Sequence, residues 1–239
     1  MLGLLSADPI DHNWLLDFRK LAVTGRVKSG SKEGHRSGWG ISYYEHGEAK
    51  YLARQSKDAS DDPNYPVACT KLQEMNYDGI LIAHLRKASM GNISVENTHP
   101  FIHGQWSFGH NGTVKGAIPT NNDYHPAGTT DSERFFAYLV SWIKTNGDTT
   151  KAIIEGLSVV RRECKYTSLS FLLSDGQRLY AYREFAKRNE KEYYGMMYTQ
   201  EAKKIVFSQE PLWNFDWTEV NNRQLIVADM DLAIQKYQI

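Results

Sequence analysis

The chain has 239 residues, of which 41% are hydrophobic and 12% aromatic, so its composition excludes a disordered chain and allows a full core. Lysine plus arginine equal aspartate plus glutamate at 28 each, and this balance gives no electrostatic reason to expect a nucleic-acid or membrane-surface partner. The two cysteines match no metal-binding spacing, the apolar runs are short and no signal peptide is visible, which together predict a cytoplasmic protein.

The first quarter of the sequence predicts a strand, a helix, a long loop and a strand pair. Residues 1–6 are apolar and typical of a strand, and apolar residues at helical spacing predict a helix over 12–22. Residues 25–38 are polar, basic and rich in Gly and Ser, and a loop of this length is either functional or disordered. Residues 39–44 and 50–54 are expected to pair around a turn.

The middle of the chain predicts a helix over 64–75, a buried strand over 78–85 and another strand over 105–110. The apolar positions of the helix are Val67, Leu72 and Met75. Between the two strands, residues 86–104 contain too few apolar residues to be core, so we expect a polar connection there.

The clearest helix signal covers residues 130–144, where Thr130 and Glu133 form a Thr-x-x-Glu capping box. A second helix is expected over 150–164. The last third is rich in strand signals, and Ser174-Asp175-Gly176-Gln177 is typical of a hairpin turn. The strands expected there are 168–174, 178–182, 193–198, 204–208 and 224–228. Strands at both ends with a helical pair between them predict two sheets covered by helices rather than a βαβ repeat.

Polar residues follow predicted strands or begin predicted helices in four short segments, residues 83–89, 97–101, 109–112 and 130–133. Taken singly, none is specific. Asn-Gly is a common hairpin dipeptide, and a carboxylate at a helix start is stabilising without any ligand. His84, His99, His103 and His110 match no zinc spacing and have no acidic ligand among them, so no metal is expected.

In combination and in this order, the segments resemble the class II glutamine amidotransferases, which are N-terminal-nucleophile hydrolases. The resemblance runs over residues 1–144 and fits the short stand-alone branch, with a looser fit of the C-terminal strands. The branch motifs Gly-Trp-Gly-Ile, His-x-Arg-x-Ala, Asn-Thr-His-Pro-Phe, His-Asn-Gly and Thr-Asp-Ser-Glu read here as residues 38–41, 84–88, 97–101, 110–112 and 130–133.

The resemblance implies a role for each matching residue. Arg86 clamps the α-carboxylate of glutamine in bidentate fashion, and Asp131 accepts hydrogen bonds from its α-ammonium. The Asn111 side chain and the Gly112 backbone N–H form the oxyanion hole. Ser89 is a further substrate-binding candidate. The residues expected to support the site are His84, Thr98, His99, His110, Trp39 and Gly40.

The resemblance breaks at the N-terminus. The nucleophile of the family is a cysteine exposed as the first residue, whose own α-amine is the base, and an internal Cys69 or Cys164 lacks that amine. In the favoured register, Met1-Leu2-Gly3 matches the family's [Leu/Met]-Leu-Gly and the cysteine lies upstream of the given start. In the other register, Leu2 replaces the cysteine and the chain is an inactive glutamine-binding module or a subunit of a larger complex.

The resemblance therefore implies an α+β fold, a four-layer αββα sandwich of two antiparallel sheets, formed by residues 1–239 as one domain. The implied function is hydrolysis of the amide of glutamine, or of a γ-glutamyl amide, through a cysteine thioester and without a cofactor. Nothing after the domain looks like a synthase, so the ammonia goes to a protein partner or the substrate is the γ-glutamyl amide of another amine. An unrelated layered α/β protein is the third alternative, disfavoured by the number and order of the matches.

Overall fold

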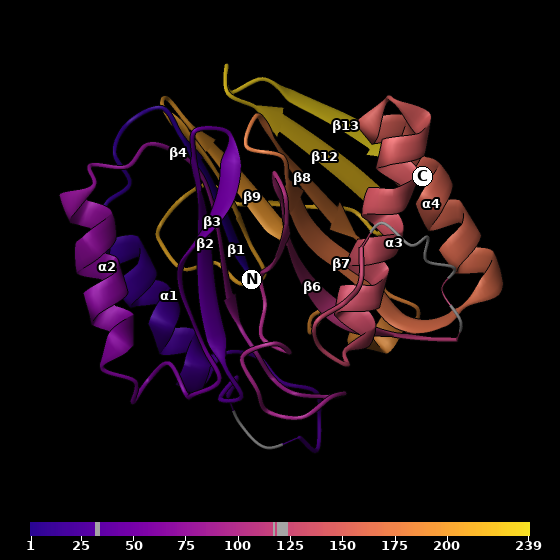
Figure 1. The fold of residues 1–239 in the computed structure, drawn as a ribbon, viewed down its shortest axis with the longest axis horizontal. Coiled ribbons are helices and arrows are strands. Elements are labelled where there is room, and N and C mark those ends of the chain that lie inside the picture. The colour runs from indigo at the N-terminus through magenta and orange to yellow at the C-terminus, as the bar shows by residue number, and fades with distance from the viewer. Residues whose placement is uncertain (32–33, 117, 119–123) are drawn as a thin grey trace.

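The computed structural model describes residues 1–31, 34–116, 118 and 124–239, and it has four layers. Figure 1 shows them side by side, with α1 and α2 on one outer face, two sheets in the middle, and α3 and α4 on the other outer face. Every strand pairing is antiparallel. The expected αββα sandwich is confirmed.

The first sheet has seven strands in the order β11-β9-β10-β1-β4-β2-β3. Their bounds in that order are Thr218–Glu219, Met197–Glu201, Lys204–Ser208, Leu2–Ser6, Gly79–Leu85, Trp39–Glu45 and Glu48–Gln55. The second sheet has six strands in the order β13-β12-β8-β7-β6-β5. Their bounds are Ile234–Gln238, Gln224–Asp229, Arg178–Arg183, Lys165–Ser174, Trp106–Lys115 and Phe101–His103.

In the part of the chain that the structure describes, four α-helices cover the sheets, and each lies within a few residues of its predicted range. They are α1 (Asn13–Thr24), α2 (Asn64–Glu74), α3 (Asp131–Asn146) and α4 (Thr149–Glu163), and a short 3-10 helix, η1, covers Arg188–Glu190. Between α1 and β2, the predicted loop is confirmed for its described residues, while residues 32–33 lie outside the described part of the chain.

The first strand, β1, lies at the centre of its sheet. Both of its edges are therefore paired, and all five of its residues are buried. Its side chains alternate between two cores, as the pleat requires. Leu2 and Leu4 pack into the core beneath α1 and α2, whereas Met1 and Leu5 belong to the core between the sheets. A side chain at Gly3 would approach Leu172 to 3.1 Å, so the sheets pack closely there.

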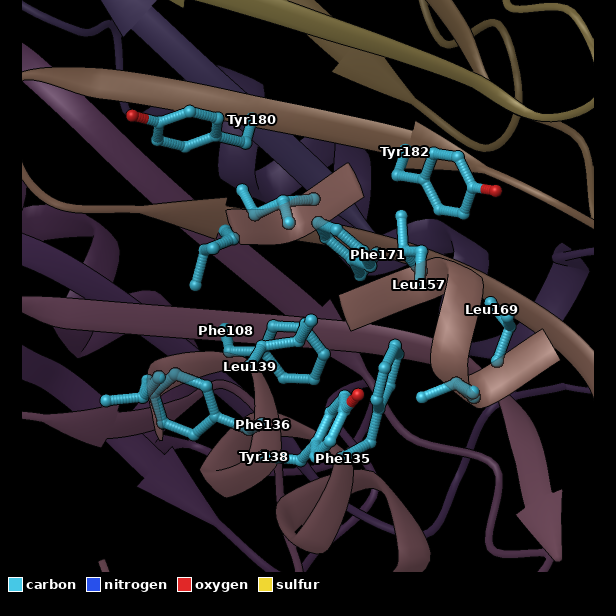
Figure 2. Close-up of a cluster of buried hydrophobic side chains, with 14 of the residues drawn as sticks. Phe108, Phe135, Phe136, Tyr138, Leu139, Leu157, Leu169, Phe171, Tyr180 and Tyr182 are labelled. Atoms are coloured by element: carbon cyan, nitrogen blue, oxygen red, sulfur yellow. The ribbon is translucent and has the colours of Figure 1, made fainter. Parts of the chain in front are cut away.

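A third core lies between the second sheet and its two helices. Figure 2 shows its aromatic residues, with Phe108 of β6 and Phe171 of β7 facing Phe135 and Phe136 of α3. The Phe108 and Phe136 rings stack with centroids 5.1 Å apart. This packing fixes α3 against β6, and both elements carry predicted site residues.

The structure differs from the predicted elements at several positions. Of the apolar positions named for the helix over 64–75, Val67 is 65% exposed on α2, whereas Leu72 is buried. The polar connection over 86–104 contains β5, and its Phe101 is fully packed in the third core. The strand predicted over 105–110 continues to Lys115 as β6, so Asn111 and Gly112 lie within a paired strand. Tyr193 and Tyr194 precede β9 instead of starting it, and β11 and β13 were not predicted.

The capping box at α3 is only half formed. The Thr130 hydroxyl accepts a hydrogen bond from the Glu133 N–H at 3.2 Å, as predicted. The Glu133 carboxylate, however, accepts from the Gly128 and Ala127 N–H groups at 2.7 and 3.0 Å instead of returning to Thr130. The glutamate therefore holds the loop that leads into the helix.

Both cysteines are free and buried. Burial raises the pKa of the Cys69 thiol to about 12, which disfavours the reactive thiolate. None of the helices in the described ranges is long and apolar enough to cross a membrane.

Candidate functional site

One pocket of about 230 Å³ collects most of the predicted site residues. Its floor and sides come from three elements, namely the end of β4 with the segment after it, the middle of β6, and the N-terminus of α3. Of the predicted residues, those that line it are His84, Arg86, Ser89, His99, His110, Asn111, Gly112 and Asp131. Trp39, Gly40 and Thr98 do not line it.

Arg86 follows β4 and is only 3% exposed. Its backbone is fixed on both sides by the loop before β2, since its N–H donates to the Gly38 carbonyl at 2.7 Å and its carbonyl accepts from the Ser37 N–H at 2.8 Å. Its guanidinium donates to the Met90 and Asn92 carbonyls at 3.0 and 3.2 Å. A guanidinium has five N–H donors, so these two bonds orient the side chain and leave donors for an anion in the pocket.

Asn111 and Gly112 lie in β6 beside an irregularity of the sheet. Their partners in β7 are Ser170 and Leu169, and the register shifts between Gly112 and Val114. A Cβ atom at Gly112 would lie 2.0 Å from the Ser168 carbonyl oxygen, so only glycine fits there. This bulge interrupts the ladder next to the two residues, and bulges of this kind occur beside active sites.

Asp131 is the first residue of α3 and is 2% exposed. One of its carboxylate oxygens accepts a hydrogen bond from the Val114 N–H at 2.7 Å, which ties the helix start to the bulge in β6. A carboxylate at a helix N-terminus is also stabilised by the helix dipole. Asp131 thus places a negative charge in the pocket opposite the positive charge of Arg86.

His110 connects β6 to its neighbours. Its Nε2 lies 3.2 Å from the Ser168 carbonyl oxygen, and its Nδ1 lies 2.9 Å from the Ser132 hydroxyl. Burial lowers the pKa of His110, with Asp131 opposing the effect, so the ring is neutral near pH 7. A carbonyl only accepts, so Nε2 carries the proton and Nδ1 accepts from Ser132.

His84 and His99 stack on each other with ring centroids 4.3 Å apart. His84 Nε2 lies 3.2 Å from the His110 carbonyl oxygen. Among the described residues, the His84 Nδ1 and both ring nitrogens of His99 have no hydrogen-bond partner although they are buried. Burial lowers the pKa of both rings well below the usual range, and the proximity of the two rings lowers that of His84 further.

The three predicted residues outside the pocket act in its framework. The Trp39 indole donates to the Asp62 carboxylate at 3.0 Å beneath α2. A Cβ atom at Gly40 would lie 2.4 Å from the His99 carbonyl oxygen, so the missing side chain lets the His99 segment lie against β2. The Thr98 hydroxyl donates to the Ser94 carbonyl at 2.8 Å. Ser89, in contrast, is exposed at the pocket with its hydroxyl 3.4 Å from that of Thr113.

One wall of the pocket was not predicted. It is formed by residues of the loop between α1 and β2, of the segment before β9 and of the position after β10, namely Lys28, Ser31, His35, Tyr193, Tyr194 and Gln209. The unusual length of the loop was the only signal in the sequence. The tyrosines were missed because they were assigned to a strand.

Within the described ranges, no group of three or more His, Cys, Asp or Glu side chains is arranged to hold a metal ion. The pocket is lined by the cation of Arg86, the carboxylate of Asp131, the bulged strand β6 and several neutral imidazoles. These groups match the charges and the polar carbonyl of a small zwitterion that carries an amide.

The sequence profile described as "Glutamine amidotransferases class-II" matches residues 2–232. An uncharacterized protein of Methanocaldococcus jannaschii is 31% identical over 222 residues, which cover 82% of this chain and 61% of the relative. A protein of Escherichia coli named "putative glutamine amidotransferase YafJ" is 33% identical over 174 residues, covering 67% of this chain and 66% of the relative. The chain thus matches less than two thirds of the length of each of these relatives.

Solved structures share the fold at low sequence identity. A glutamine aminotransferase class-II domain protein from Silicibacter pomeroyi superposes with a TM-score of 0.67 at 21% identity, covering 100% of this chain and 98% of the other. The glutamine phosphoribosylpyrophosphate amidotransferase of Bacillus subtilis gives a TM-score of 0.66 at 14% identity, covering 99% of this chain and 48% of the other.

Proposed function

The chain belongs to the class II glutamine amidotransferases, and from that premise we propose that it hydrolyses the side-chain amide of glutamine or of a γ-glutamyl amide through a cysteine thioester. The observation that carries the proposal is the convergence of Arg86, Asp131, Asn111 and Gly112, from three separate elements, on one pocket. A volume of about 230 Å³ lies below the usual range for drug-sized ligands and suits a small polar substrate. Residues 1–239 are proposed to form one such domain.

In the proposed complex, the Arg86 guanidinium binds the α-carboxylate and Asp131 accepts from the α-ammonium. The Asn111 side-chain amide and the Gly112 N–H then face the side-chain carbonyl oxygen and stabilise the charge that develops on it. Ser89 adds a hydroxyl at the pocket surface. The two charged groups on the α-carbon are fixed by Arg86 and Asp131, so the length of the γ-glutamyl side chain determines whether its carbonyl reaches the bulge.

We place the nucleophile on a cysteine two residues ahead of Met1. The backbone nitrogen of Met1 donates to the Gln209 side chain at 2.8 Å, and Gln209 lines the pocket. Alternate residues of a strand share a face, so a residue two places before Met1 points into the space between the sheets, as Met1 does. Extension of β1 therefore brings that side chain toward Asn111 and Gly112.

The chemistry then runs in two steps. The α-amine of the cysteine takes the thiol proton, the sulfur attacks the amide carbon, and the C–N bond breaks as the amine leaves with that proton. Water then hydrolyses the thioester, which returns the thiol and releases glutamate. His110, held neutral between Ser132 and Ser168, supports the bulge and exchanges no proton with the substrate in this scheme.

The pocket assignment is tested by the affinity for glutamine, measured by calorimetry. Replacing Arg86 by Lys removes the bidentate geometry, and we expect affinity to fall about 100-fold while the fold is retained. Arg162→Lys on the exposed face of α4 is the matched control and should bind as the parent does. Parent-like affinity in Arg86→Lys would contradict the assignment.

The thioester is tested on the protein expressed from its own locus with the upstream DNA included. A diazoketone analogue of glutamine alkylates an activated thiol, and we expect a mass increment on an N-terminal cysteine together with glutaminase activity. If the protein binds glutamine but shows neither the mass increment nor release of ammonia, it is a binding module or an inactive subunit.

A further inference from the structure

The bulge beside Gly112 is held together by a side chain as well as by the backbone. Where the register shifts, two residues of β7, Thr167 and Ser168, lie opposite the single residue Thr113 of β6. In a regular antiparallel ladder, the N–H of such a residue donates to a backbone carbonyl of the neighbouring strand. The Thr113 N–H donates instead to the Thr167 hydroxyl oxygen, at 3.0 Å. A side-chain acceptor thus replaces a bond of the ladder at this position.

The pairing of the strands sets the direction of the Gly112 N–H. Gly112 is paired with Leu169, whose own N–H donates to the Glu184 carbonyl at 3.0 Å, on the β8 side of β7. The N–H and C=O of a strand residue point to the same side, so the Gly112–Leu169 pair is of the kind that exchanges no hydrogen bonds. The Gly112 N–H therefore points away from β7, to the side where the Val114 N–H donates to Asp131.

The peptide group that follows Gly112 is the part of this arrangement that needs an anchor. Glycine has no Cβ atom, so the peptide groups on either side of it rotate more freely than at other residues. The N–H of Thr113 belongs to the peptide after Gly112, and Thr167 holds it. Gly112 and Thr113 line the pocket, whereas Thr167 does not. The Thr167 hydroxyl therefore acts on a substrate through the strand and not by contact.

Tyr194 fixes the Thr167 hydroxyl from the other side, since its O–H donates to the same oxygen at 2.8 Å. Tyr194 is itself 2% exposed and firmly held. The Arg183 guanidinium donates to two carbonyl oxygens of the segment before β9, that of Tyr194 among them, at 2.9 Å each. The Tyr194 ring lies 4.7 Å from the Nζ of Lys28, which forms an ion pair with Glu190 at 3.0 Å. Backbone and ring are thus both fixed.

We propose that Thr167 is a positioning residue for the oxyanion hole and that Tyr194 acts through it. The Tyr194 O–H and the Thr113 N–H meet at one hydroxyl oxygen, and this junction keeps the Gly112 N–H directed into the pocket. A donor that is aligned beforehand needs no reorganisation when charge develops on the carbonyl oxygen of the substrate. The inference rests on the proposed function, because the oxyanion hole is part of it.

The test is steady-state hydrolysis of glutamine by the protein expressed from its own locus, with the upstream DNA included. Thr167→Val keeps the shape of the side chain and removes the hydroxyl, whereas Thr167→Ser keeps the hydroxyl. An oxyanion donor acts in the transition state, so we expect kcat to fall about 10-fold in Thr167→Val with KM unchanged. Thr167→Ser should keep the kcat of the parent. A change confined to kcat separates positioning of the donor from a loosened pocket, which would raise KM.

A double-mutant cycle tests the role of Tyr194. Tyr194→Phe removes only the O–H, and it should lower kcat by no more than Thr167→Val does. The double variant should have the kcat of Thr167→Val alone, because both hydroxyls act through the same Thr113 N–H. Thr199→Val is the matched control, since Thr199 is 2% exposed in β9 and donates its hydroxyl to the Glu201 carboxylate at 3.2 Å. It should keep both kinetic constants of the parent.

The outcomes separate this inference from the proposed function. Parent-like kcat in Thr167→Val would overturn the positioning role and leave the proposed function standing. Effects of Thr167→Val and Tyr194→Phe that multiply in the double variant would show that Tyr194 acts independently, and would overturn its action through Thr167. A parent protein that hydrolyses no glutamine would overturn the proposed function, and the oxyanion hole with it.

Discussion

At the scale of single residues, the most constrained position of the site is Gly112. An added Cβ atom would lie 2.0 Å from the Ser168 carbonyl oxygen and 2.8 Å from His110 Nε2, and the backbone oxygen belongs to a paired strand that cannot move away. We expect Gly112→Ala to lower the free energy of unfolding by about 3 kcal/mol or more, measured by urea denaturation.

Gly156 within α4 provides the comparison for this substitution. Its added Cβ atom would meet its nearest neighbours, Leu139, Trp142 and Tyr138, at 3.5 Å, an ordinary contact. Alanine is favoured over glycine inside a helix by about 1 kcal/mol, so Gly156→Ala should leave stability unchanged or raise it. Equal stability of the two variants would mean that the backbone at the bulge adjusts more easily than its contacts imply.

At the scale of elements, the two residues of the capping box at the start of α3 have different functions: Thr130 caps the helix, and Glu133 holds the loop before it. Thr130 makes an ordinary N-cap bond, so Thr130→Ala should cost about 1 kcal/mol of stability. Glu133 is 3% exposed and accepts from the Ala127 N–H, the Gly128 N–H and the Tyr124 hydroxyl. Glu133→Ala leaves three donors without their partner, and we expect a loss of about 3 kcal/mol in urea denaturation.

The N-cap of α4 calibrates this comparison. The Asp148 carboxylate accepts from the Lys151 N–H at 3.0 Å in an exposed position. Asp148→Ala should therefore resemble Thr130→Ala, at about 1 kcal/mol. A loss for Glu133→Ala no larger than these two would argue that its contacts with the loop do not contribute to stability.

The wall of the pocket depends on Arg183 at the end of β8. Its guanidinium also donates to the Val220 carbonyl and pairs with Glu219 at 2.7 Å, in addition to its bonds to the segment before β9. Removal of a buried charge that satisfies several carbonyls costs about 3 kcal/mol, and we expect this loss in Arg183→Met. Hydrogen exchange should then be faster at Tyr193 and Tyr194 than in the parent, whereas Arg134→Met, on the first turns of α3, should leave these amides unchanged.

The sequence predicted the elements of the fold wherever an apolar pattern decided them, as in β1, β4 and α3. It failed for residues 86–104, because burial of the polar residues there depends on their hydrogen bonds, while Phe101 is the member of the stretch that packs in the third core. The Asn97 side chain, for example, donates to the Asn92 carbonyl at 3.0 Å and accepts from the Thr129 N–H at 2.7 Å. A composition pattern contains no information on such partners.

The site residues likewise divide into those that a sequence motif identifies and those that only the folded structure brings to the pocket. Arg86, Asn111, Gly112 and Asp131 lie in short motifs whose order along the chain is informative, so the sequence could select them. The Lys28 wall could not be selected, because its ion pair joins residues 162 positions apart and its tyrosines belong to no motif. Contacts of this kind follow only from the assembled sheets.

At the scale of the whole molecule, the buried histidines determine how stability depends on pH. Burial lowers the pKa of His84, His99 and His110, and it lowers the pKa of His35 to about 4. Since an unfolded histidine has a pKa of about 6.5, the unfolded chain binds more protons than the folded chain below that pH. The contribution of these rings to stability is thus complete above pH 6.5 and is lost as the pH falls toward their folded pKa values.

The free energy of unfolding should consequently fall by at least about 2 kcal/mol between pH 6.5 and 5, since each ring contributes up to about 1.4 kcal/mol per pH unit. Carboxylates with lowered pKa values, such as Asp17 and Glu219, lose their contribution only below their usual pKa values of 3.8 and 4.5, so they do not contribute in this window. Burial lowers the pKa of the Met1 α-amine from 8.0 to about 5, so this amine adds to the fall that the histidines cause. Urea denaturation across the window measures the slope, and exposed His46 supplies the control, His46→Gln, which should keep it. A flat profile would mean that the buried rings take up protons in the folded state, and the neutral tautomer assigned to His110 would then be wrong.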